Sequence, residues 1–297
     1  MTNSKNLIGE ISSLWRFPVK SMGGERLREI EITPNGVLGD RAYALLDIDT
    51  GKVVSAKSVK FFPDLIKCHA EFVTPPLLDE KIPAVQITLP NETVLRSDDP
   101  DVHKQLSNYF GRSIKLIEEA PEDFTIDQYH PDIAEVDPSG KRHTTVNQKL
   151  GHALFKSAGL TSPVPMGSFL DVFPVSIITS STLTKLNFLS PNSHFDERRF
   201  RMNIVVKTVE EGFLENSWVG KTIQFGTVPQ LSVAMPDPRC VMTTLEQTDL
   251  AQDLDILRTL VKHNRLELPG MGSFPCAGVY AVVHRHGKVK LTDSVLI

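Results

Sequence analysis

Short β-rich runs separated by turn residues constrain the fold of this chain more than any other feature. Residues 11–17, 26–32 and 41–48 alternate apolar and polar side chains or are rich in β-forming residues. Gly, Pro, Asn and Asp gather at 33–36 and 49–52, in the combinations that tight turns use. The first third of the chain is therefore predicted to be mainly short strands.

The same pattern continues toward the C-terminus, with few helices. Helical spacing of apolar residues predicts short helices at 101–111, 180–189 and 253–266. Further strands are expected at 113–118, 172–179, 202–206, 221–226, 230–235, 276–283 and 287–297. Strands and helices do not alternate regularly along the sequence, as they would in repeated βαβ units. We therefore predict a mostly β (α+β) fold with a barrel-like architecture and few short helices.

The segment between Glu118 and Asp171 is the least patterned part of the sequence. It is rich in Pro, Asp and Glu and holds few apolar residues. Such a composition is typical of a long connection, so we expect a domain junction here.

Composition excludes several classes of protein. With 297 residues, 40% hydrophobic and 23% charged, the chain is long enough for one large or two medium globular domains. The net charge of −4 argues against broad binding to nucleic acid or to an anionic membrane, which usually needs a basic excess. Any site for an anion must therefore be local.

The N-terminal residues have no continuous apolar segment typical of a secretory signal, and no later apolar run approaches ~18 residues. A cytoplasmic protein without a membrane association is expected. Three widely separated cysteines, Cys68, Cys240 and Cys276, form neither a disulfide framework nor a paired metal motif. An iron–sulfur cluster takes about four cysteine ligands, so the chain is not expected to hold one alone.

Lys20, Ser21 and Arg41 are candidates for binding an anion. Lys20 and Ser21 lie between a proline and two glycines, where an ammonium group, a hydroxyl and backbone amides could together surround a phosphate. Arg41 begins an apolar run and could extend from the end of a barrel into a cleft. The simpler interpretations are a solvated lysine in a turn and a surface ion pair with Asp40.

Three arginines precede the buried run at 202–206. Strand alternation would put Arg201 and Asn203 on one face, away from Met202, so that both could bind one ligand. A solvated run of charge is the expectation for Arg198 and Arg199.

Cys240 directly follows Arg239. A neighbouring arginine can favour the thiolate, which is the form of cysteine that attacks electrophiles and binds metals. The alternative is a small apolar residue in the core. The histidines show no spacing of metal ligands, and no pair of carboxylates is singled out for acid–base chemistry.

Six motifs follow one another along the chain: LWRFPVKSMGGERL, GDRAYALLD, SFLDVFPVSIIT, RRFRMNIVV, DPRCVMTTL and CAGVYA. In these motifs and their order the chain resembles, from about Ile11 to its end, the MOSC-domain proteins that have a MOSC N-terminal β-barrel domain. Within this family it resembles the amidoxime-reducing component of mitochondria and its bacterial relatives. The resemblance implies an N-terminal barrel-like domain at 1–120 and a MOSC domain at 121–297.

The resemblance further implies a molybdenum cofactor, a pterin whose dithiolene binds molybdenum and whose side chain ends in a phosphate. Cys240 would be the metal ligand and the catalytic residue, because a soft thiolate suits a sulfur-rich metal centre. The cofactor-binding positions implied in this sequence are Lys20, Ser21, Arg41, Asp171, Arg201, Asn203, Arg239 and Tyr280. This chain departs from the pattern after Asp171, where Val172 and Phe173 replace hydroxyl residues, and at Thr292-Asp293, which we interpret as a turn variant.

The activity that the resemblance implies is reduction of N-hydroxylated compounds, or of related N- or S-oxides, by a molybdenum-dependent oxidoreductase. The sequence has no flavin or nicotinamide fingerprint and no ferredoxin-like cysteine cluster. Electrons would therefore come from a partner, either a reductase or a flavodoxin- or ferredoxin-like carrier. Two alternatives stay open: a sulfur carrier with a persulfide on Cys240, and a pterin carrier without catalytic activity.

Overall fold

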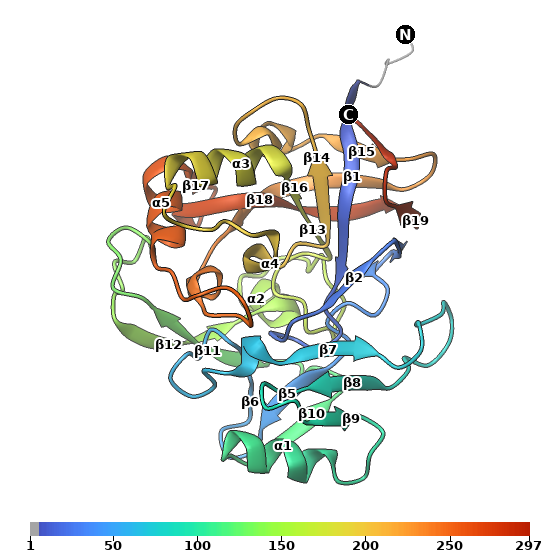
Figure 1. Cartoon of the computed structure of the whole chain (residues 1–297), viewed down its shortest axis with the longest axis vertical. Coiled ribbons are helices and arrows are strands. Elements are labelled where there is room, and N and C mark those ends of the chain that lie inside the picture. Colours follow the sequence, from blue (N-terminus) through green and yellow to red (C-terminus); the bar gives the residue numbers. More distant parts are fainter. Residues whose placement is uncertain (1–5) are drawn as a thin grey trace.

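The computed structural model describes residues 6–297, and seven strands within that range close into a barrel (Figure 1). Each strand pairs with the next, and the last pairs back with the first, so that the ring is complete. In ring order the strands are β13 (Val175–Thr179), β14 (Ile204–Lys207), β1 (Leu7–Arg16), β20 (Ser294–Leu296), β15 (Thr222–Phe225), β16 (Gln230–Pro238) and β18 (Gly272–Arg285).

Strand β1 is the only barrel strand of the described chain that lies before residue 175. It is antiparallel to both β14 and β20, and Leu7 lies opposite Leu296. The N-terminal strand and the C-terminal end of the chain consequently lie side by side (Figure 1). The predicted boundary between 1–120 and 121–297 therefore divides the sequence but not the barrel. The first segment contributes strand β1 to the barrel, and the second contributes the other strands.

The barrel core is formed by side chains that alternate along its strands. Ile11, Ile177, Val206, Phe225 and Val279 all belong to one buried cluster. Strand β13 is buried at all five positions, as its apolar sequence leads one to expect. Two short strands extend the sheet, β2 (Glu25–Leu27) beside β1 and β17 (Arg265–Leu268) beside β18.

A second lobe, in the lower part of Figure 1, contains two three-stranded sheets and one helix. A third small sheet joins the N-terminal segment to the C-terminal one. The elements of the lobe are β5 (Ala44–Asp47), β6 (Lys52–Val53), β10 (Ile114–Ile117), β7 (His69–Phe72), β8 (Val85–Thr88), β9 (Val94–Arg96), η1 (Leu65–Lys67) and α1 (Val102–Phe110); the third sheet is β3 (Glu29–Thr33), β4 (Gly36–Val37) and β19 (Gly287–Lys290).

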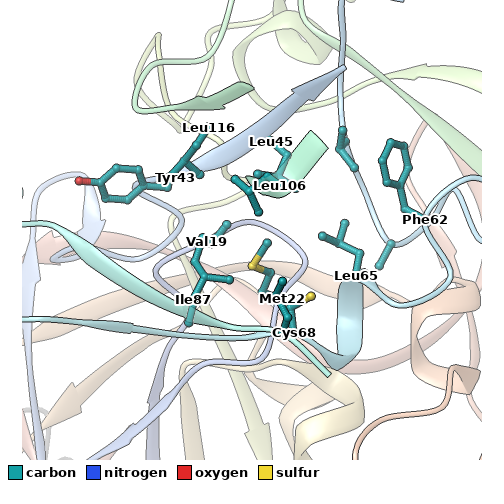
Figure 2. Close-up of a cluster of buried hydrophobic side chains, with 14 of the residues drawn as sticks. Val19, Met22, Tyr43, Leu45, Phe62, Leu65, Cys68, Ile87, Leu106 and Leu116 are labelled. Carbon is teal, nitrogen blue, oxygen red and sulfur yellow. The ribbon is translucent and has the colours of Figure 1, made fainter. Parts of the chain in front are cut away.

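The core of this lobe includes the loop that carries the first predicted binding residues. Val19 and Met22 pack among Leu45, Ile87 and Leu106, as Figure 2 shows. Lys20 and Ser21, between them, are directed elsewhere, because they line the cavity described below. Burial of the two apolar neighbours therefore fixes the position of the polar pair.

The weakly patterned segment at 118–171 is more ordered than its composition indicated. It contains an antiparallel hairpin of β11 (Thr125–His130) and β12 (Thr144–Lys149), followed by α2 (Gly151–Ser157). Along β11 only Ile126 is fully buried, so the strand has almost no apolar alternation for a sequence pattern to reveal.

Two further expectations need local correction. Strands β13 and β14 are parallel, with α3 (Ser180–Leu189) and α4 (Glu197–Phe200) between them, so one βαβ crossover is present. The helix expected at 253–266 is α5 (Asp255–His263), and its last predicted residues belong to β17. The helix at 101–111 ends as predicted, at Gly111 with a left-handed φ of 66°.

No helix in residues 6–297 has the length and apolar character to cross a bilayer.

Candidate functional site

The nine residues that the sequence analysis singled out line one cavity. It encloses about 760 Å³ of atom-free space, including its opening to solvent. The nine come from loops and strand ends of both lobes: Lys20, Ser21, Arg41, Asp171, Arg201, Asn203, Arg239, Cys240 and Tyr280. Small ligands bind in concave sites where a few polar groups converge, so this cavity is the candidate functional site.

Two lysines share one carboxylate in the cavity wall. Lys20 pairs with Asp171 and donates to the carbonyl oxygen of Phe169 at 2.7 Å. Lys57, which the sequence analysis did not identify, donates to the other carboxylate oxygen of Asp171 at 2.7 Å and is 7% exposed. Because both ammonium groups rely on one carboxylate, an unbalanced positive charge remains.

The pKa shifts of this trio follow from burial and from the pairing. Burial lowers the pKa of Lys20, and Asp171 opposes it only in part. The pKa of Asp171 lies well below its usual value, because the two lysines outweigh the effect of burial. Burial also acts against Lys57, but Asp171 and then Cys240 raise its pKa above the ordinary value. Lys57 is thus a cation that interacts electrostatically with Cys240.

Two arginines lie against one phenylalanine ring. The guanidinium carbons of Arg41 and Arg201 lie 4.5 and 4.3 Å from the centre of Phe17. Arg41 also pairs with Asp40 and donates to the carbonyl oxygen of Arg201 at 3.1 Å. Arg201 donates to the carbonyl oxygen of Met22. These contacts hold two cations close together at one end of the cavity.

Arg201 has unused capacity for hydrogen bonding. Its Nη2 is buried and has no partner among the residues that the structure describes. Burial, with Arg41 nearby, lowers its pKa to about 9, which marks a guanidinium charge that the protein itself balances poorly. A buried donor without a partner is costly, so the geometry suits a ligand with an anionic or acceptor group.

Three residues of the wall have left-handed backbones. The φ angles of Ser21, Arg41 and Arg201 are 69°, 49° and 55°. Strand alternation is therefore not what brings Arg201 and Asn203 into the cavity: Arg201 ends α4 in this conformation, before β14 begins. Arg41 likewise lies in a turn before β5 instead of opening the strand. Strained residues of this kind cluster at functional sites.

Asn203 lines the cavity, but its amide is used within the protein. Its Oδ1 accepts from the backbone N–H and the hydroxyl of Ser176, each at 3.1 Å. Its Nδ2 donates to Asp40 at 3.0 Å, and Asp40 in turn pairs with Arg41. In this structure Asn203 orients the arginine end of the cavity.

Cys240 lies between β16 and the 3₁₀ turn η3 (Val241–Thr244). Its carbonyl oxygen accepts from the backbone N–H and the hydroxyl of Thr243, at 3.2 and 3.0 Å. The thiol is partly exposed, whereas Cys68 and Cys276 are buried, and none of the three forms a disulfide in the described chain. Burial raises the pKa of each of the other two to about 12.

The guanidinium of Arg239 bonds to groups other than the cysteine that follows it. Its guanidinium pairs with Asp237 and donates to the carbonyl oxygen of Phe200. Asp237 is 2% exposed, and burial raises its pKa to about 6, although Arg239 opposes the shift. The Tyr280 hydroxyl hydrogen-bonds to Asp237, and burial raises the pKa of Tyr280 well above its ordinary value. Asp237 is a second functional candidate that sequence reasoning missed.

Arg199 corrects the expectation of a solvated charge. It is 2% exposed and lines the cavity. Its guanidinium donates to the carbonyl oxygens of His194, Leu245 and Ala251 at 2.9, 3.2 and 2.8 Å. It therefore clamps the segment that follows Cys240. Arg198, which pairs with Asp196 and Asp249, has the more exposed position that was expected.

The substitution at Phe173 adds an aromatic wall. Phe173 stacks on Tyr280, with ring centres 5.6 Å apart and an angle of 29° between the planes. Phe155 packs against the edge of Phe173. The Phe173 side chain itself lines the cavity, at a position where the resemblance implies a hydroxyl residue.

The wall has a strong excess of positive charge. Among described residues it holds six cationic side chains, Lys20, Arg41, Lys57, Arg199, Arg201 and Arg239, against the carboxylates of Asp171 and Asp237. The whole chain carries a net charge of −4, so this concentration is local. A polyanionic ligand that can also accept from Arg201 and from the unpaired Nε of Arg239 fits the wall. Residues 6–297 contain no cluster of three or more His, Cys, Asp or Glu side chains suited to a metal ion.

The fold and the domains that form the cavity define the class of the protein. Residues 8–119 match the MOSC N-terminal beta barrel domain, and residues 166–296 match the MOSC domain. The chain therefore belongs to the MOSC-domain proteins that carry a MOSC N-terminal beta barrel domain.

Particular relatives are similar over nearly the full chain. The chain is 28% identical to the human mitochondrial amidoxime reducing component 2 over 307 residues, covering 97% of this chain and 83% of that protein. It is 22% identical to human mitochondrial amidoxime-reducing component 1, covering 98% and 83%. Among solved structures, the YuaD protein from Bacillus subtilis aligns with 99% of this chain and 97% of its own, at 10% identity and a TM-score of 0.44.

Proposed function

We propose that this protein is a molybdenum-cofactor-dependent oxidoreductase that reduces N-hydroxylated compounds, with Cys240 as the protein ligand of molybdenum. One observation carries the proposal: a strongly cationic cavity has a partly exposed cysteine in its wall. The MOSC domain and the similarity to amidoxime reducing components supply the chemical class.

The residues of the wall divide between the two ends of such a cofactor. The arginine pair of Arg41 and Arg201, with Lys20 and Ser21, would bind its phosphate, since guanidinium groups and phosphate oxygens form directed, charge-assisted hydrogen bonds. Cys240 would bind the metal as a thiolate, the form of cysteine that coordinates metals. When bound, the cofactor supplies two-electron oxygen-atom transfer, which no side chain can provide.

The reduction itself consumes protons as well as electrons. An N-hydroxyl compound takes up two electrons and two protons, the N–O bond breaks, and the oxygen leaves as water. Asp237 has a pKa of about 6, so its carboxyl can hold a proton near neutral pH, and the Tyr280 hydroxyl is hydrogen-bonded to it. These two groups are our candidates for supplying a proton within the wall.

The electrons come from a separate protein in this proposal. We expect a reductase or a flavodoxin- or ferredoxin-like carrier as the partner, a small N-hydroxylated molecule as the substrate, and neither nucleic acid nor membrane. A cytoplasmic location remains part of the proposal.

A sulfur carrier is the second candidate. Cys240 is the cysteine with a partly exposed thiol, and a persulfide formed there would lie in a cavity that is open to solvent. A carrier needs no metal, which separates the two proposals experimentally.

The test is metal analysis of the wild type, Cys240→Ser and Cys276→Ser after expression in cells that make the cofactor. Cys276 is a matched control, because it is buried and does not line the cavity. We expect molybdenum and pterin in the wild type and in Cys276→Ser, loss of the metal in Cys240→Ser, and reduction of an amidoxime with a chemical electron donor only where metal is bound.

Other results would decide against the proposal. Equal molybdenum in Cys240→Ser and the wild type would exclude Cys240 as the ligand. A wild type without metal but with a persulfide on Cys240, seen by intact-mass spectrometry, would establish the sulfur carrier. Bound cofactor without any turnover would leave a cofactor carrier.

A further inference from the structure

A second cavity reaches the same cysteine from the side of the β11–β12 hairpin. It shares Lys57, Asp171, Pro238, Arg239, Cys240 and Tyr280 with the cationic cavity. It encloses about 1020 Å³ of atom-free space, including its opening to solvent. A molecule in this second cavity would therefore share a wall with whatever fills the first.

The hairpin turns one face toward this cavity. Gln128, Tyr129 and His130 of β11 line it, and so do Val146 and Gln148 of β12, whereas Thr145 and Asn147 on either side of Val146 are exposed. The alternation along β12 follows from the two-residue period of a strand. The hairpin, which the sequence pattern did not reveal, forms a wall of the cavity.

The chemistry of the second cavity differs from that of the first. Beyond the shared wall it is mostly apolar, with Leu150, Leu154, Met271 and Phe274 among its lining. Its described charged side chains are nearly balanced, Lys57, Lys141 and Arg239 against Asp137 and Asp171. Such a lining suits an uncharged molecule with an apolar body, and not a polyanion.

His130 is a polar residue in the lining of this cavity. Its Nδ1 lies 3.1 Å from a carboxylate oxygen of Asp137, so the ring donates there. Burial lowers the pKa of His130, with Asp137 opposing the shift and Lys141 adding to it, so the ring is neutral at pH 7. The Nε2 is then an acceptor, and it is buried without a hydrogen-bond partner in the described structure.

We propose that the second cavity is the substrate chamber. It takes small uncharged molecules that have an apolar body and an N–O–H or N–H group that donates to His130. The inference rests on the proposed function for the reaction, but the binding site is defined by this chain's own residues. It assigns the anionic cofactor to one side of Cys240 and the substrate to the other.

The test compares Val146→Trp with Thr145→Trp, neighbouring residues of β12 that lie inside and outside the chamber. The probes are benzamidoxime and acetamidoxime, which share one head and differ in the size of the body. Binding is measured by calorimetry on cofactor-loaded protein without a reductant, so that no turnover occurs. Molybdenum content serves as the check that each variant is folded and loaded.

We expect Val146→Trp to weaken binding of benzamidoxime about tenfold or more and that of acetamidoxime much less, while Thr145→Trp changes neither. His130→Ala should weaken both probes, and His284→Ala, at an exposed site on β18, should weaken neither. Under turnover, Val146→Trp should raise KM for benzamidoxime with little change in kcat.

Failure of the chamber and failure of the proposed function give different results. The chamber is overturned if the wild type binds neither probe, or if Val146→Trp binds benzamidoxime as well as the wild type does. If binding follows the expected order but a chemical donor yields no reduced product, the chamber stands and the reductase proposal fails.

Discussion

The ion pair of Asp237 and Arg239 shows how burial sets the chemistry of single residues in this wall. Both side chains are removed from water. Desolvation raises the pKa of the Asp237 carboxyl more than the charge of Arg239 lowers it, so the pKa is about 6. A carboxyl that is protonated in part at neutral pH is rare on a surface and useful beside a reacting group.

This shift makes a prediction for stability. The folded-state pKa of Asp237 is about 6 and the ordinary value is 3.8, so the folded protein binds this proton more tightly than the unfolded chain. Stability from the protonated form should be complete below the ordinary value and lost as pH rises through the folded one. Urea unfolding at several pH values should show the free energy of the wild type falling relative to Asp237→Asn between these limits. Parallel curves for the two proteins would contradict the shift.

The residues that sequence reasoning found differ in kind from those it missed. Cys240, Lys20 and Arg201 stand in short motifs whose residue types alone indicate a binding role. Lys57 and Asp237 have a role in the site only because of a distant partner or of burial, and neither can be seen in a single sequence.

Among the elements, η3 depends on a guanidinium from another segment. Arg199 donates to the carbonyl oxygens of Leu245 and Ala251, which follow this turn, and to that of His194 in its own segment. A lysine has a single ammonium group and cannot span them, so its substitution leaves buried acceptors unpaired.

We expect Arg199→Lys to lower the free energy of unfolding by about 3 kcal/mol. Its neighbour Arg198 makes exposed ion pairs, so Arg198→Lys should change it by less than about 0.5 kcal/mol. Urea denaturation of the two variants checks the difference. Similar losses for both would mean that the clamp contributes little.

Packing of β18 against β13 depends on the absence of a side chain at Gly278. Its φ is +79°, and an added Cβ would lie 2.6 Å from the carbonyl oxygen of Ile177. Gly220 has nearly the same φ, +81°, but no described atom lies within 4 Å of its Cβ position. The pair therefore separates steric conflict from backbone strain.

Gly278→Ala should cost about 3 kcal/mol or more, from overpacking added to the left-handed conformation. Gly220→Ala should cost only about 1 kcal/mol, from the conformation alone. Thermal unfolding followed by circular dichroism tests both. Equal costs would show that the barrel adjusts to the extra methyl group.

At the scale of the molecule, the two lobes are connected both by the path of the chain and by ion pairs. Strand β1 belongs to the barrel, while the loop after it packs in the core of the other lobe. Asp171 holds Lys20 and Lys57 across the junction. Short strands and turns in the sequence predicted a mostly β fold. The closure of the barrel could not be predicted in this way, because β13 and β18 pair residues about 100 positions apart. A local sequence pattern gives no information on such a distant pairing.

These connections predict one cooperative unfolding transition. Trp15 lies in β1 and Trp218 near the barrel, so tryptophan fluorescence reports on the barrel, whereas far-ultraviolet circular dichroism reports on all strands. The two signals should give the same urea midpoint. A lower midpoint by circular dichroism would show that the second lobe unfolds first.

The pairing of β1 with β20 also has a consequence for synthesis. One barrel neighbour of β1 lies almost the whole described chain away, because Leu7 pairs with Leu296. During synthesis this edge of β1 therefore stays unpaired until β20 has been made. The barrel can close only after that, and any ligand that needs both lobes is captured later still.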